Sequence, residues 1–111
     1  MTRLDGKWAL VTGSSRGIGQ QVAAGLARLG CGVIVHGRSR GNLDETLRLL
    51  EPLGVPVRAV SGELSSPEGV EQVIAETRAL GVPVDVLYNN AAIQNAWRPV
   101  WDITREEWLH S

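Results

Sequence analysis

Glycine and hydroxyl residues gather in one short segment near the amino terminus, with the order Thr-Gly-Ser-Ser-Arg-Gly-Ile-Gly over residues 12–19. Glycines let a backbone turn tightly and approach a ligand closely, and free amides at the start of a helix favour an anion. The chemistry on offer is therefore the binding of a phosphate group. The other reading is a plain glycine-rich turn that needs only positive φ angles. The residues expected to meet a ligand are Gly13, Ser14, Ser15, Arg16, Gly17, Ile18 and Gly19.

The residues on either side predict that this segment joins a strand to a helix. Residues 8–12 form a short apolar run, which suits a buried strand because its apolar residues do not alternate with polar ones. After the glycines, Ile18, Val22, Leu26 and Leu29 recur at helical spacing, which predicts the apolar face of a helix that ends at Gly30. The turn thus lies where a helix start can receive a phosphate.

The alternation of strand and helix continues along the chain. Strands are predicted at residues 32–36, 55–60 and 84–89, and helices at residues 43–50, from Ser65-Ser66-Pro67 to about Leu80, and from Thr104 onward. Strict alternation with short connections implies parallel strands joined by right-handed crossovers. The predicted fold is a doubly wound three-layer α/β/α sheet in a single domain of residues 1–111. Ligands of such sheets bind beyond the carboxyl ends of the strands.

A second motif, Asn89-Asn90-Ala91-Ala92, follows the last predicted strand. Together with the pattern Thr-Gly-x-x-x-Gly-x-Gly it resembles the non-extended short-chain dehydrogenases/reductases, from about Leu4 to Ser111. The resemblance implies a Rossmann-like fold, represented by its first four strands or so. It also implies hydride transfer between a nicotinamide cofactor and a small carbonyl or alcohol substrate, in a full-length protein that forms homo-oligomers. Ala92 stands where the family motif usually ends in glycine.

The residues after the second predicted strand distinguish the two nicotinamide dinucleotides. An acid there binds the ribose 2′-hydroxyl of NAD, whereas a basic residue accepts the 2′-phosphate of NADP. The residues at this place are His36, Gly37, Arg38, Ser39 and Arg40. Arg38 is the expected clamp because a guanidinium makes paired, charge-assisted hydrogen bonds to phosphate, and Arg16 resembles the second basic residue of NADP-preferring members. The expected cofactor is NADP(H), and the other reading leaves both arginines as solvated surface charges.

Further cofactor contacts are implied by the resemblance. Glu63-Leu64 resembles an Asp-Leu pair whose acid receives the adenine amino group, although glutamate is one methylene longer. Asn90, Ala91 and Ala92 are expected to border the ribose and nicotinamide; Asn90 has a second reading, in which it ties neighbouring strands together.

Three polar residues near the turn have more than one expected role. His36 is read as a strand-end residue near the adenine rather than as a proton shuttle. Ser14 and Ser15 offer hydroxyls to the phosphates, or cap the following helix.

The acid–base residues of the family have no counterpart among these 111 residues. The family uses a tyrosine as general acid/base with a lysine four residues later, whereas this chain has only Tyr88 and only Lys7. No catalytic residue is therefore expected, and the chain alone is expected to be inactive. The alternative function is a non-catalytic dinucleotide-binding or interaction module.

Composition sets outer limits on the partners. A formal net charge of −1 argues against nucleic acid, which calls for a basic excess. The single cysteine, Cys31, cannot form an intrachain disulfide and suggests a reducing compartment. No apolar stretch reaches the length of a membrane span or signal peptide. A cytoplasmic protein without a metal site is expected.

Overall fold

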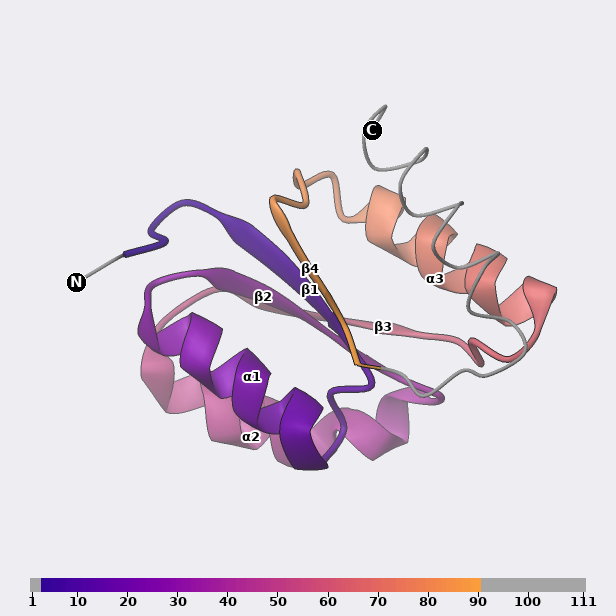
Figure 1. Ribbon diagram of the computed structural model, residues 1–111, viewed down its shortest axis with the longest axis horizontal. Helices are drawn as coiled ribbons and strands as arrows, with labels where there is room; N and C mark the ends of the chain where they lie inside the picture. Colours follow the sequence, from indigo (N-terminus) through magenta and orange to yellow (C-terminus); the bar gives the residue numbers. More distant parts are fainter. Residues whose placement is uncertain (1–2, 91–111) are drawn as a thin grey trace.

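In the computed structural model the described residues, 3–90, form a four-stranded parallel sheet with helices on both faces (Figure 1). The strands lie in the order β3-β2-β1-β4. Their bounds are β1 Trp8–Thr12, β2 Gly32–Gly37, β3 Val57–Ser61 and β4 Val86–Asn89. The helices are α1 Gly17–Arg28, α2 Asp44–Leu50 and α3 Pro67–Ala79, with 3-10 turns η1 Arg40–Leu43 and η2 Glu51–Leu53 on either side of α2. The predicted α/β fold, Rossmann-like and wound in three layers, is confirmed.

The two central strands bury both of their faces. Along β1, Leu10 faces one side of the sheet and Val11 the other, as successive strand residues must. Leu10 packs in a cluster with Val70 and Val73 of α3, whereas Val11 packs in a second cluster with Ala23 of α1. Figure 1 shows the same division, with α1 and α2 on one face and α3 on the other. The uninterrupted apolar character of residues 8–12 follows from this double burial.

The apolar face predicted for α1 is not the face that packs closest to the sheet. Ile18 is 69% exposed, while small residues of the helix, Ala23, Ala24 and Ala27, are fully or almost fully buried. Val22 and Leu26 are only partly buried at the margin of the cluster. Small side chains let α1 approach the sheet closely, and a count of large apolar residues does not detect such a face.

Two strand starts were predicted two residues too early. β3 begins at Val57 rather than Val55, because Pro56 has no N–H to donate and contributes only its carbonyl, 3.0 Å from the amide of Val33. β4 begins at Val86 rather than Val84. Before it, Asp85 closes the pairing by donating its N–H to the Trp8 carbonyl at 2.8 Å and accepting the Trp8 N–H on its carboxylate at 2.9 Å.

The sheet order creates the place where a ligand can enter. The chain passes from β1 through β2 to β3 in one direction, and then β4 pairs with the other side of β1. The order therefore reverses at β1, and the chain leaves β1 and β4 at the same edge of the sheet, at their carboxyl ends. The glycine turn follows β1 directly at this point.

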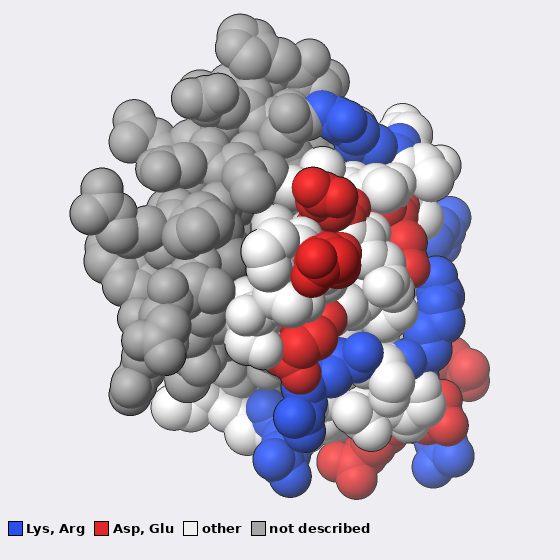
Figure 2. All heavy atoms as spheres, turned by 90° about the vertical axis from the view of Figure 1, so that its right-hand side faces the viewer, with Lys and Arg blue, Asp and Glu red and all other residues white. Residues whose placement is uncertain are grey.

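The described part of the chain contains neither a candidate membrane-spanning helix nor a candidate metal site. Within residues 3–90, no helix has the length and apolar character needed to cross a bilayer, and no group of three His, Cys, Asp or Glu side chains comes together to hold a metal ion. On the face drawn in Figure 2, a short column of acidic side chains is flanked by basic ones, so that charges of both signs share this surface.

Candidate functional site

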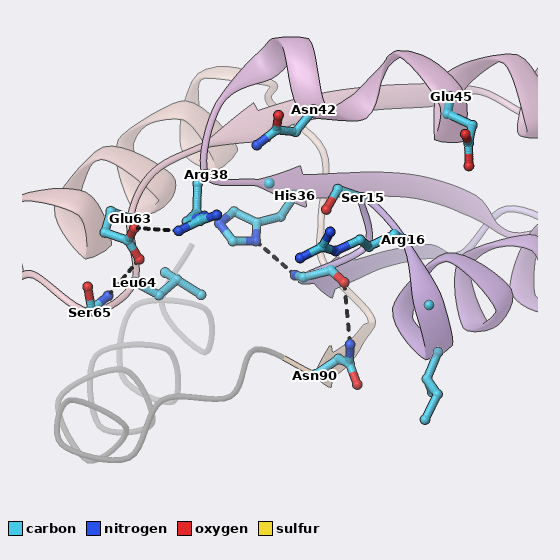
Figure 3. A pocket seen from close by; sticks show the side chains of 14 residues that line it. Ser15, Arg16, His36, Arg38, Asn42, Glu45, Glu63, Leu64, Ser65 and Asn90 are labelled. Carbon is cyan, nitrogen blue, oxygen red and sulfur yellow. Dashed lines mark hydrogen bonds and ion pairs between the residues drawn. The ribbon is translucent and has the colours of Figure 1, made fainter.

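A cavity of about 960 Å³ lies at the carboxyl ends of the strands. It draws residues from the exits of all four strands, which Figure 3 shows converging on one hollow. The predicted site residues that line it are Gly13, Ser15, Arg16, Gly17, Ile18, His36, Gly37, Arg38, Glu63, Leu64 and Asn90. Segments far apart in sequence are thus gathered around one space.

Three predicted residues do not line this cavity. Ser14 is fully buried, its hydroxyl is engaged with the backbone of His36, and it does not cap α1. Gly19 instead faces the backbone of Gly13, and Ser39 is not part of the lining although Arg38 and Asn42 on either side of it are. Ala91 and Ala92 fall outside the described residues.

The glycine turn has the backbone geometry that its composition predicts. Gly13 and Gly17 have φ angles of +62° and +64°, a region that residues with a Cβ rarely adopt. Gly19 is required for a different reason, namely lack of space. A Cβ at this position would collide with the Gly13 carbonyl and lie 2.8 Å from the side-chain nitrogen Nδ2 of Asn90. The start of α1 can therefore lie directly against the turn.

The amino end of α1 has no side chain to satisfy its amides. Arg16 occupies the N-cap position with an extended backbone and makes no side-chain cap hydrogen bond, and Ser15 likewise does not cap the helix. The first amides of a helix have no partner inside it, and the helix dipole makes this end favourable for negative charge. An anion in the cavity can supply the missing acceptor.

His36 connects the turn to the ends of β2 and β3. Its side chain is nearly buried, with Nδ1 2.9 Å from the Gly13 amide nitrogen and Nε2 2.9 Å from the Gly62 carbonyl oxygen. Burial lowers the pKa of His36, against smaller opposing effects from the Gly62 hydrogen bond and from Glu63 and Glu76. A neutral imidazole follows at physiological pH, which suits a structural residue better than a proton shuttle.

The exit of β4 supports the turn from the opposite side. The amide side chain of Asn90 donates to the Gly13 carbonyl at 3.3 Å, and its backbone N–H donates to the Thr12 hydroxyl at 2.9 Å. The Thr12 hydroxyl in turn donates to Asn89 Oδ1 at 2.8 Å. Asn90 therefore ties neighbouring strands together, the second of its two expected roles, while still bordering the cavity.

Two guanidinium groups extend into the cavity from different elements. Figure 3 shows Arg16 reaching in from the turn and Arg38 from the end of β2. Arg38 Nη1 lies 3.8 Å from a carboxylate oxygen of Glu63, with side chains 70% and 48% exposed. Because exposed ion pairs of this kind stabilise a protein by only about 0–1 kcal/mol, this contact can be exchanged for a stronger anionic partner.

Three further residues line the cavity that the sequence did not single out, namely Asn42, Glu45 and Ser65. Asn42 comes from η1, and Glu45 comes from the first turn of α2, where its carboxylate accepts a hydrogen bond from Gln20 at 3.2 Å. The turn η1 folds these residues back over the end of β2. The types of these residues carry no distinctive motif; the path of η1 and α2 reveals Asn42 and Glu45, and the connection from β3 to α3 reveals Ser65.

The residues available for proton transfer are far apart in the described structure. Lys7 precedes the amino end of β1, whereas Tyr88 pairs with Val11 near the carboxyl end of the same strand. The two cannot act as a tyrosine–lysine pair, because they lie toward opposite ends of the sheet. The cavity lining itself offers helix-start amides and two guanidinium groups, which suit an anion.

Comparison with known proteins identifies the family. The family model for short chain dehydrogenases matches residues 7–111, nearly the whole chain. The chain belongs to the short-chain dehydrogenase family. The gluconate 5-dehydrogenase of Gluconobacter oxydans is 39% identical over 106 residues, which cover 95% of this chain and 41% of that protein. The human dehydrogenase/reductase SDR family member 4 is 34% identical over 111 residues, which cover 97% of this chain and 40% of that protein.

Solved structures of short-chain dehydrogenases share this fold. A 3-oxoacyl (acyl-carrier-protein) reductase from Agrobacterium tumefaciens with NADP bound has a TM-score of 0.75 and 39% identity, covering 83% of this chain and 35% of that one. The L-sorbose reductase from Gluconobacter frateurii, in complex with NADPH and L-sorbose, has a TM-score of 0.74 and 38% identity over 81% of this chain and 35% of that one.

The match covers only part of each relative. The chain spans about two fifths of the length of the curated family members it resembles. Homologues of this family are dehydrogenases and reductases, and some bind NADP or NADPH.

Proposed function

We propose that this chain is the NADP(H)-binding part of an oxidoreductase that transfers hydride between the nicotinamide and a carbonyl or alcohol substrate. Residues 1–111 would belong to a single cofactor-binding domain. The observation that carries the proposal is the convergence of Arg16, Arg38 and the glycine turn on one cavity. The bound nicotinamide would supply the hydride, and the residues described here would hold and orient the dinucleotide.

The lining of the cavity fits a dinucleotide with an additional phosphate. The uncapped start of α1 offers amides to the bridging phosphates, and the absent side chain of Gly17, where a Cβ would meet nothing within 4 Å, leaves room for close approach. Arg38, at the end of β2, is suited to the 2′-phosphate of NADP, and positions 36–40 contain no carboxylate that would favour NAD. Glu63 and Leu64 border the side expected for adenine.

A cofactor titration tests this assignment. NADPH should bind more tightly than NADH, and Arg38→Ala should weaken NADPH binding roughly 10- to 100-fold while changing NADH binding little, because hydrogen bonds to charged groups contribute about 1.5–3 kcal/mol. Arg40→Ala is the matched control, since Arg40 is an exposed neighbour paired with Glu76 at 3.3 Å and outside the cavity lining. Equal affinity of both cofactors for all three proteins would refute the NADP assignment.

A second candidate function is a non-catalytic dinucleotide-binding or interaction module. It is favoured by one sequence fact, namely that the only tyrosine and the only lysine of these 111 residues cannot form a Tyr-x-x-x-Lys motif. Sequencing the gene beyond the codon for Ser111 separates the two. An in-frame Tyr-x-x-x-Lys supports the enzyme, whereas a stop codon supports the module.

The proposed setting is a reducing, cytoplasmic one, with a homo-oligomer as the full-length form. The thiol of Cys31 is free and fully buried, and because it takes part in no disulfide it supports a reducing setting. The homo-oligomer follows from the family resemblance alone.

A further inference from the structure

His36 is a buried polar residue whose two ring nitrogens have opposite requirements. Only 3% of the residue is exposed, although its ring reaches the wall of the cavity. The Gly13 amide can only donate to Nδ1, and the Gly62 carbonyl can only accept from Nε2. The partners therefore fix the neutral tautomer with the proton on Nε2.

The backbone of His36 holds the next residue of the turn as well. Its N–H donates to Ser14 Oγ at 2.8 Å, and its carbonyl accepts the Ser14 N–H at 2.9 Å and the Ser14 hydroxyl at 3.3 Å. On the other side, Asn90 donates to the Gly13 carbonyl. Both backbone polar atoms of Gly13 are thus held by side chains, one from each neighbouring strand.

We propose that His36 is a positioning residue for the dinucleotide, whose neutral ring aims the glycine turn and whose protonation weakens cofactor binding. The inference rests on the proposed function, because it concerns the same cavity. A proton on Nδ1 would place two donors, the ring N–H and the Gly13 N–H, against each other. The turn must then shift, and with it the amides that would receive the phosphates.

The direction of the pH effect follows from the surroundings of the ring. Burial is the largest influence and lowers the pKa, so that the ring is neutral at physiological pH and becomes charged only as the pH falls below the ordinary histidine value of about 6.5. Glu63 and Glu76 oppose this shift without reversing it. The charged residues that line the same cavity as the ring are Arg16, Arg38, Glu45 and Glu63, and Glu76 of α3 also acts on the ring.

Binding of NADPH as a function of pH tests the proposal. As the pH is lowered from about 7.5 through the ordinary histidine pKa of about 6.5 to about pH 5, the affinity of the wild-type chain should fall, and most of the fall should come below pH 6.5, because burial lowers the pKa of His36. His36→Asn is the matched control, because its amide oxygen can accept the Gly13 N–H near the position of Nδ1 and does not titrate. The 2′-phosphate of NADPH, with a pKa of about 6, titrates equally in both proteins and cancels in the comparison.

Two outcomes would overturn the inference. One is an affinity of the His36→Asn protein that falls with pH as steeply as that of the wild type; the other is a flat wild-type profile. Failure of the wild type to bind either dinucleotide at about pH 7.5, above the ordinary histidine pKa of about 6.5, would instead refute the proposed function on which the inference rests.

Nitrogen-15 spectra of labelled histidine provide a readout that does not depend on the cofactor. They should show an unprotonated Nδ1 and a protonated Nε2 for His36, with His110→Gln used to assign the two histidines of the chain. A proton on Nδ1 at neutral pH would refute the inference even where the pH profiles agree with it.

Discussion

At the scale of single residues, two glycines of the same helix have opposite surroundings. Gly19 and Gly25 both lie in α1, so that alanine at either position removes the same backbone flexibility. A Cβ at Gly25 would meet no atom within 4 Å, whereas a Cβ at Gly19 would collide with the Gly13 carbonyl. The backbone of the turn cannot give way easily, because side chains hold Gly13 from two strands.

Alanine substitutions at these positions should therefore change stability in opposite directions. Gly25→Ala should stabilise the fold by roughly 0.5–1 kcal/mol through helix propensity. Gly19→Ala should destabilise it by about 1–3 kcal/mol, the usual cost of overpacking, and should also weaken NADPH binding. Urea unfolding of the three proteins measures the difference. Equal stabilisation by both substitutions would show that α1 does not lie against the turn.

At the scale of elements, α3 begins with a well-defined cap. The Ser66 hydroxyl accepts the Gly69 N–H at 3.0 Å, and Pro67 follows at the first helical position. Ser65 is the adjacent hydroxyl residue, and its side chain makes no hydrogen bond within residues 3–90. The pair offers a direct comparison between a capping and a non-capping serine.

Removal of the cap should destabilise the protein by a modest amount. Ser66→Ala should lower the free energy of unfolding by about 1 kcal/mol, the usual effect of losing an N-cap side chain. Ser65→Ala should change it by less than about 0.5 kcal/mol, as is typical of surface positions. Thermal or urea unfolding checks both values, and an equal effect of the two substitutions would contradict the assignment of Ser66 as the cap.

Element order was predictable from the sequence, whereas several packing details were not. The limits of β1 and the start of α3 follow from local signals, namely an apolar run and a serine–proline pair. The buried face of α1 does not, because small residues pack there for reasons set by the neighbouring turn and sheet. The late start of β3 at Val57 reflects Pro56, which has no N–H to donate to β2, although the apolar and β-branched pattern of residues 55–60 extends past it.

The candidate site also has some features that the sequence predicts and others that it does not. The convergence of the turn, Arg38 and Glu63 follows from motif positions on a fold whose strand ends meet at one edge. The buried position of the Ser14 hydroxyl and the entry of Glu45 into the cavity depend on tertiary contacts between segments more than 20 residues apart. Residue type alone cannot reveal these contacts.

At the scale of the whole molecule, Cys31 reports on opening of the sheet. Its side chain is fully buried, with Sγ 3.4 Å from the Lys7 carbonyl, and burial together with the charge of Asp85 raises the pKa of the thiol. Both effects suppress the thiolate that reacts with thiol reagents. Cys31 precedes β2, and the five residues from there to His36 correspond to roughly 16 Å along the strand. A ligand in the cavity therefore does not touch it.

Labelling of Cys31 should consequently slow when NADPH binds at the opposite end of the sheet. If labelling requires global opening, NADPH at 100 times its dissociation constant should slow it about 100-fold, equivalent to about 2.7 kcal/mol of added stability. The rate is measured with a chromophoric thiol reagent, and Arg38→Ala at the same NADPH concentration should show much less protection. A rate unchanged by NADPH would mean that the amino ends of β1 and β2 open locally, so that the cavity and Cys31 do not belong to one cooperative unit.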